Sequence, residues 1–167
     1  MREMDKDGIL LCEIQGRIFE ESCDKYKTSS PVFIRRFMNS ALAADMDTEG
    51  FLERPFNEED SFDLLDREFG PSSYGSVKYS PDILNWIGYL YRYWAYTYEE
   101  PSKRIFRIAG ARELRDLYYA YHSLDTLNAL QRIIEAKGLD ADGNRYSIDE
   151  GVKYLREVRR EVHAENY

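Results

Sequence analysis

The chain has 167 residues, of which 43% are hydrophobic and 14% aromatic, and its formal net charge is −8 at pH 7. This length fits one domain, and the apolar content is sufficient for a buried core. The negative charge argues against broad affinity for nucleic acids or anionic membranes, because both attract basic surfaces.

Helical periodicity dominates the first 70 residues. Apolar side chains recur every three or four positions between Gly8 and Lys25, which is typical of one helix face. Ser30 followed by Pro31 predicts the start of a second helix, since serine caps helices and proline favours their first turn. The acidic run at 57–60 predicts a third, short helix, because negative charge stabilises a helix N-terminus.

The segment 70–76 is rich in Gly, Pro and Ser and is the clearest predicted loop. Ser80 and Pro81 then open a long aromatic helix that we expect to end near Tyr98. A helix that is apolar nearly all round lies at the centre of a core or at an interface. We expect its core stripe to contain Ile83, Ile87, Leu90, Tyr91, Trp94 and Tyr98.

One narrow strip of this central helix is polar or small, and it consists of Asn85, Gly88 and Arg92. Gly88 lowers helix propensity by about 1 kcal/mol relative to alanine, so close approach of another helix is a reasonable explanation for it. Of the residues on this helix, the two polar ones, Asn85 and Arg92, are those that burial in a core explains least.

Further helices are expected at 101–110, 111–121 and 123–137. Few segments alternate with the period of a strand, so the sequence predicts an all-α fold. We expect a compact multi-helix bundle around the central aromatic helix (about 80–98), with residues 1–167 forming a single helical domain. Its parts are acidic N-terminal helices at 1–70, an aromatic helical core at 76–138, and a C-terminal turn and helix extension at 139–167.

The two cysteines, Cys12 and Cys23, lie about three helical turns apart, or about 16 Å in a continuous helix. That separation is too large for a disulfide, and unpaired thiols suit a reducing cytoplasm. No signal-peptide pattern and no apolar run of about 20 residues is present. The sequence therefore predicts a cytoplasmic protein without membrane association.

Residue patterns for catalysis or metal binding are missing from the sequence. The two histidines, His122 and His163, are far apart and have no zinc-ligand neighbours at the usual spacing. The segment 140–146 starts like a calcium loop, but Arg145 and Gly151 replace its required glycine and glutamate. No glycine-rich phosphate loop, serine nucleophile elbow or Cys–His pair occurs. We therefore predict no enzymatic activity and no cofactor; whether the 140–150 turn binds an ion stays open.

Basic side chains cluster in the segment 101–116, which has the outline of a helix-turn-helix. They are Lys103, Arg104, Arg107, Arg112 and Arg115. A DNA-binding regulator that uses this segment is the alternative functional hypothesis, although Asp116 and the overall negative charge weigh against it. An acidic protein partner or an ordinary solvated helix face are the other interpretations.

Four segments together resemble a group of small, uncharacterised helical proteins from gut-type Gram-positive bacteria. They are Leu10–Gln15, Phe33–Ser40, Tyr79–Trp94 and Tyr121–Asp125. The resemblance covers most of residues 9–135. Genes of that group tend to sit beside small toxin-like genes, including ones similar to ADP-ribosyl transferases, so the resemblance implies an antitoxin or accessory protein. It implies no catalytic residues, because the group has no established activity.

The sequence hypothesis is therefore an interaction module that binds a protein, such as a toxin, or a second copy of itself. Acidic character steers a protein onto a basic partner, and tyrosines dominate many binding hot spots. The predicted contact residues are Tyr91, Arg92, Tyr96 and Tyr98. Trp86 and Trp94 are assigned to the core.

Overall fold

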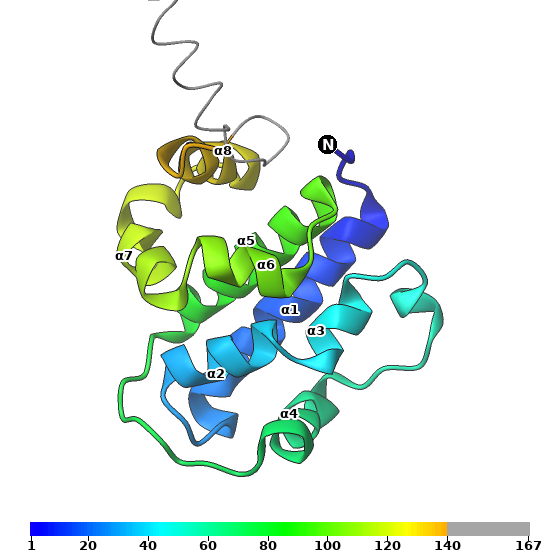
Figure 1. Cartoon of the computed structure of the whole chain (residues 1–167), viewed down its shortest axis with the longest axis vertical. Helices are drawn as coiled ribbons and strands as arrows, with labels where there is room; N and C mark the ends of the chain where they lie inside the picture. Colours follow the sequence, from blue (N-terminus) through cyan, green and yellow to red (C-terminus); the bar gives the residue numbers. More distant parts are fainter. Residues whose placement is uncertain (140–167) are drawn as a thin grey trace, which may run out of the picture. The chain divides into compact units, whose positions relative to one another are not determined.

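The computed structural model describes residues 1–139, and this part of the chain contains eight α-helices and no β-strand (Figure 1). The helices are α1 (Lys6–Lys25), α2 (Ser30–Met38), α3 (Ala41–Met46), α4 (Ser61–Phe69), α5 (Pro81–Tyr98), α6 (Ser102–Ile108), α7 (Ala111–Tyr121) and α8 (Thr126–Ala136). Two single 3-10 turns, η1 (Phe51–Glu53) and η2 (Glu58–Asp60), precede α4. The predicted all-α class is confirmed.

The chain divides after Leu130 into two units, and the helices α1 to α7 all belong to the first. The predicted turn at 140–150, with the helix after it, lies outside the described residues.

Serine caps start three of the helices. The hydroxyl of Ser40 accepts a hydrogen bond from the Ala43 N–H at 3.1 Å, and Ser80 accepts one from the N–H of Ile83 at 3.4 Å. The cap of α2 is Ser29, one residue earlier than predicted. Ser30 is used differently, because its hydroxyl accepts a hydrogen bond from the Tyr79 N–H at 2.8 Å and so holds the segment before α5.

The predicted loop after α4 is fastened to the connection between α1 and α2. Ser29 and Ser30 donate their N–H groups to the carbonyl oxygens of Tyr74 and Val77, at 2.9 and 2.8 Å. The ammonium group of Lys78 donates to carbonyl oxygens at the C-terminal end of α1. A cation at this position offsets the partial negative charge of the helix end.

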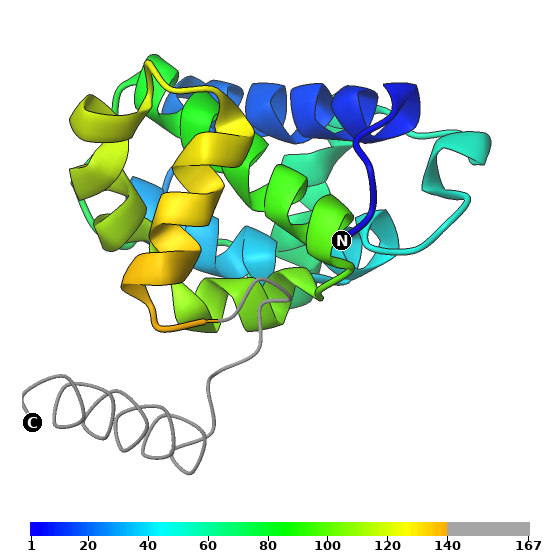
Figure 2. The same ribbon diagram turned by 90° about the horizontal axis from the view of Figure 1, so that it is seen from above.

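Helices α1 and α5 lie side by side and make the most extensive contact in this unit (Figures 1 and 2). The contact is close because α5 has no side chain at Gly88. A β-carbon added there would lie 2.8 Å from the carbonyl oxygen of Gln15 and 2.7 Å from the ring of Phe19. The close helix approach that Gly88 suggests in the sequence is thus present.

A cluster of aromatic rings fills the interior beside this contact. Phe19 meets the rings of Phe33 and Phe37 edge to face, at centroid distances of 5.1 and 5.0 Å. Tyr91 adjoins Phe19, and its hydroxyl donates to the carbonyl oxygen of Ala109 at 2.6 Å. The predicted core stripe of α5 is buried except for Tyr98, which is half-buried.

We expect Gly88→Ala to destabilise the protein by about 1–3 kcal/mol, since the added methyl group overlaps a backbone oxygen that cannot move without shifting α1. Chemical denaturation followed by circular dichroism measures the effect. Gly110→Ala is the matched control, because a β-carbon there meets no atom within 4 Å. A change below about 1 kcal/mol is expected for the control; equal losses in both variants would contradict the packing argument.

Candidate functional site

Arg92 is the most unusual side chain of α5, because it carries a charge and is only 1% exposed. Its Nε donates to the Gln15 side-chain oxygen at 2.8 Å, and its Nη2 donates to the hydroxyl of Ser102 at 3.0 Å. Its Nη1 donates to the carboxylate of Asp47 at 2.6 Å. The guanidinium therefore joins α5 to α1, to the residue after α3, and to α6.

Asp47 has a second partner besides Arg92. Its Oδ2 accepts the backbone N–H of Ser102 at 2.8 Å, and its Oδ1 accepts the Ser102 hydroxyl at 2.7 Å. The side chain is 17% exposed, so the carboxylate is largely turned inward although the residue lies at the surface. The first N–H groups of a helix lack partners within it, so Asp47 also satisfies the start of α6.

Burial lowers the pKa of Arg92 below its ordinary value, and the neighbouring carboxylate of Asp47 partly offsets this effect. An arginine stays charged in a protein, so the guanidinium needs a counter-charge inside the fold. Asp47 supplies it. The ion pair of Arg92 and Asp47 is nearly neutral as a whole, and it forms the fixed base of an open space.

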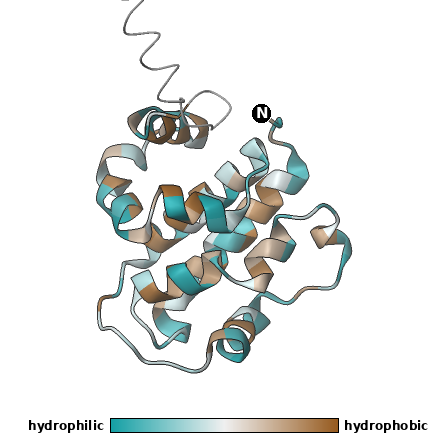
Figure 3. Cartoon of the chain, in the orientation of Figure 1, coloured by the Kyte–Doolittle hydropathy of each residue, from teal (hydrophilic) through white to brown (hydrophobic). Residues whose placement is uncertain are grey.

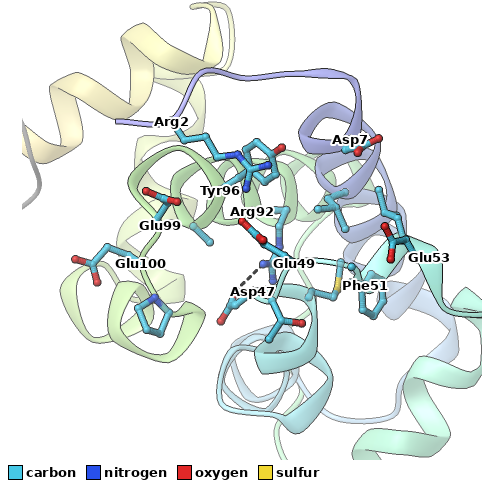
Figure 4. A pocket seen from close by; sticks show the side chains of 17 residues that line it. Arg2, Asp7, Asp47, Glu49, Phe51, Glu53, Arg92, Tyr96, Glu99 and Glu100 are labelled. Atoms are coloured by element: carbon cyan, nitrogen blue, oxygen red, sulfur yellow. Dashed lines mark hydrogen bonds and ion pairs between the residues drawn. The ribbon is translucent and has the colours of Figure 1, made fainter.

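That space is a pocket of about 440 Å³ (Figure 4). Figure 4 shows Glu99 and Glu100 on one side of it and Asp7 and Glu53 on the other, with Glu49 between them. These carboxylates come from α1, from the segment after α3, and from the end of α5. We call this site the acidic pocket.

The N-terminal segment forms part of the pocket wall. The Tyr96 hydroxyl donates to the carboxylate of Asp5 at 2.6 Å, and the guanidinium of Arg2 lies over the Tyr96 ring at 4.0 Å from its centre. Arg2 also donates its backbone N–H to the carbonyl oxygen of Thr97 at 2.6 Å. Burial, together with the hydrogen bond to Asp5, raises the pKa of Tyr96 to about 12, so this hydroxyl remains a donor at neutral pH.

The structure separates the four contact residues predicted from the sequence. Tyr91 and Arg92 are buried, and their polar groups are used inside the protein; Arg92 lies at the base of the acidic pocket. Tyr96 and Tyr98 are half-exposed, and Tyr96 lines the acidic pocket. Of the four predicted residues, Arg92 and Tyr96 line the acidic pocket, whereas Tyr91 and Tyr98 do not.

The five basic residues predicted for the alternative function are all exposed, on α6 and α7. Hydrophilic turns of α6 are visible in Figure 3. Arg104 pairs with Glu100 at 2.9 Å, and Arg115 lies near Asp116 at 3.4 Å. No described residue forms an ion pair with Lys103, Arg107 or Arg112.

Sequence reasoning found Arg92 but missed Asp47 and the carboxylates around the pocket. They lie outside the motifs, and 45 residues separate Asp47 from the arginine that it neutralises. The available signal was chemical: an arginine on a helix that is otherwise almost entirely apolar requires a buried acceptor. That requirement does not say which of the 31 acidic residues meets it.

Within residues 1–139, no group of three or more His, Cys, Asp or Glu side chains is arranged to hold a metal ion. None of the helices in that range has both the length and the apolar character needed to cross a membrane. Comparison with family models, with curated proteins and with solved structures finds no match to this chain.

We expect Asp47→Asn to destabilise the protein by about 3 kcal/mol, because it leaves the buried charge of Arg92 without a counter-ion. Glu58→Gln is the matched control, since Glu58 pairs with Arg17 at 2.7 Å on the surface. An exposed pair contributes at most about 1 kcal/mol. Urea denaturation measures the free energy of unfolding of both variants. Similar losses of stability would show that Arg92 does not depend on Asp47.

Proposed function

We propose that the chain is an interaction module that binds a basic protein partner in the manner of an antitoxin, and that the acidic pocket is its contact surface. The observation that carries the proposal is the charge of the pocket. Asp7, Glu49, Glu53 and Glu99 line it, and none of them forms an ion pair with another described residue.

The two arginines of the pocket do not cancel this charge. Arg92 is paired with Asp47 at its base, and Arg2 is placed over the Tyr96 ring, 3.8 Å from the carboxylate of Asp5. A concave surface with uncompensated charge of one sign concentrates field lines and accelerates association with a partner of opposite sign. The overall charge of −8 acts in the same direction.

Tyr96 lines the acidic pocket and is half-exposed, so it adds aromatic area to this surface. The resemblance to proteins encoded beside toxin-like genes supports a toxin as the partner. The free thiols of Cys12 and Cys23 support action in the reducing cytoplasm.

The test uses the protein encoded beside the gene of this chain. We expect it to form a complex with the wild-type chain that Glu49→Lys/Glu99→Lys weakens at least about tenfold, or about 1.4 kcal/mol, because like charges then face each other. Isothermal titration calorimetry measures the affinity, and growth rescue on co-expression provides the biological readout.

The control is Asp24→Lys/Asp63→Lys, which makes the same charge change at two exposed residues outside the acidic pocket. It is expected to bind within about threefold of the wild type, since distant surface charges are screened by salt. If both double variants weakened binding equally, the change in net charge, and not the position of the charges in the acidic pocket, would be the cause. Absence of a complex, or association of the chain only with itself, would overturn the proposal.

A DNA-binding regulator is the second proposal, supported by the five exposed cations of α6 and α7. Contacts to phosphates release counter-ions, so binding must weaken as salt increases. We expect any retardation of the upstream promoter fragment at low salt to be reduced by Arg104→Ala/Arg107→Ala. No retardation by the wild-type chain at low salt would remove this function.

A further inference from the structure

A second pocket, of about 400 Å³, lies among the first half of α5, helix α1 and helix α7. It shares no lining residue with the acidic pocket. Six of its lining side chains are aromatic or charged: Glu20, Asp82, Trp86, Tyr89, Tyr118 and His122. We call it the aromatic pocket.

Its walls are rings that hold one another in place. Trp86 and Tyr118 meet edge to face, with centroids 5.7 Å apart and planes at 79°. His122 stacks on Tyr118 at 4.4 Å and 16°, and its Nδ1 lies 2.8 Å from the Tyr118 carbonyl oxygen. Trp86, Tyr89 and Tyr118 are each only half-buried, so aromatic surface is open to a ligand. Trp86, which the sequence assigned to the core, is thus half-buried at the wall of a pocket.

The charged groups of the aromatic pocket are all negative. Glu20 and Asp82 contribute carboxylates, and no lysine or arginine lines the pocket. Asn85 donates to the Glu20 carboxylate at 3.0 Å, which orients that group without neutralising it. Neither carboxylate forms an ion pair with another residue in the described range.

Aromatic surface combined with carboxylates selects a particular kind of ligand. The electron-rich face of an aromatic ring attracts a cation, most often a guanidinium, and tryptophan is the most favourable ring. A guanidinium is planar and weakly hydrated, so it can stack on a ring while it donates hydrogen bonds to a carboxylate. At about 400 Å³, the pocket lies within the range of about 300–1,000 Å³ that is usual for ligand sites, so it has room for an arginine side chain.

We propose that the aromatic pocket binds the side chain of an arginine presented by the partner protein. The proposal deepens the proposed function and rests on it only for the source of the arginine. Recognition of the guanidinium itself can be tested with a small molecule, independently of any partner.

The probe is N-acetyl-L-arginine amide, added to the full-length ¹⁵N-labelled chain. The chain has two tryptophans, so two indole resonances report on binding, and that of the buried Trp94 serves as an internal reference. We expect a saturable shift of the Trp86 resonance with a dissociation constant of about 1 mM, a strength usual for so small a ligand. N-acetyl-L-citrulline amide, which has the same shape without the charge, should bind at least tenfold more weakly.

Three single substitutions locate the binding. Tyr118→Leu removes a wall of the pocket and should weaken arginine binding about fivefold. Tyr74→Leu makes the same change at a 75% exposed ring that does not line the pocket, and should leave binding within twofold. Glu20→Gln removes one carboxylate charge without altering the rings and should also weaken binding about fivefold, so the test holds even if Tyr118→Leu fails to fold.

A Trp86 shift that stays linear to about 50 mM, or equal binding of the citrulline compound, would overturn the inference. Equal weakening by Tyr118→Leu and Tyr74→Leu would overturn it as well. The Glu49→Lys/Glu99→Lys variant should bind the arginine compound like the wild type, because those residues belong to the other pocket. Failure at the aromatic pocket and failure at the acidic pocket are therefore separate results.

Discussion

The buried guanidinium of Arg92 is the constraint on which the arrangement of residues 1–130 depends. It bonds to Gln15, Asp47 and Ser102, which belong to three segments far apart in the chain. Because the charge cannot be removed, the protein must bring a carboxylate to it. Asp47 does so and at the same time accepts the first N–H of α6. The end of α3, the start of α6 and the middle of α5 are thereby held together, and the base of the acidic pocket is formed.

Helix α5 has a different role at each end. Its first half carries Trp86 and Tyr89, which line the aromatic pocket. Its second half carries Arg92 and Tyr96, which line the acidic pocket. Carboxylates that form no ion pair with a described residue lie in both pockets. A protein with a basic surface could engage them at two separate points. Two weak contacts of this kind give tighter binding together than either gives alone when one partner protein can reach both pockets.

The sequence predicted most of the helices, because their ends depend on local chemistry, but it did not predict α3 as a separate helix. Ser80 and Pro81 start α5 as expected, and the absence of a side chain at Gly88 does correspond to a close helix contact. The error at the start of α2 is one residue, since Ser29 and Ser30 have the same capping chemistry. The sequence alone cannot show that Ser30 is used by a loop 49 residues away.

The candidate sites were harder to predict, because they depend on contacts between distant segments. A polar strip on a helix faces either solvent or another element that brings its own polar partners, and a helical wheel cannot distinguish the two. We expected Arg92 to contact a partner protein, whereas inside the protein Asp47 and Gln15 accept its hydrogen bonds. The same limit applies to Trp86, whose half-exposed position depends on where α7 places Tyr118.

A double-mutant cycle on Arg92 and Asp47 tests this account most directly. The free energy of unfolding is measured for the wild type, Arg92→Met, Asp47→Asn and the double variant. If the two side chains depend on each other as described, the double variant loses at least about 1.5 kcal/mol less than the sum of the single losses. Losses that add within about 0.5 kcal/mol would contradict the central role of this pair.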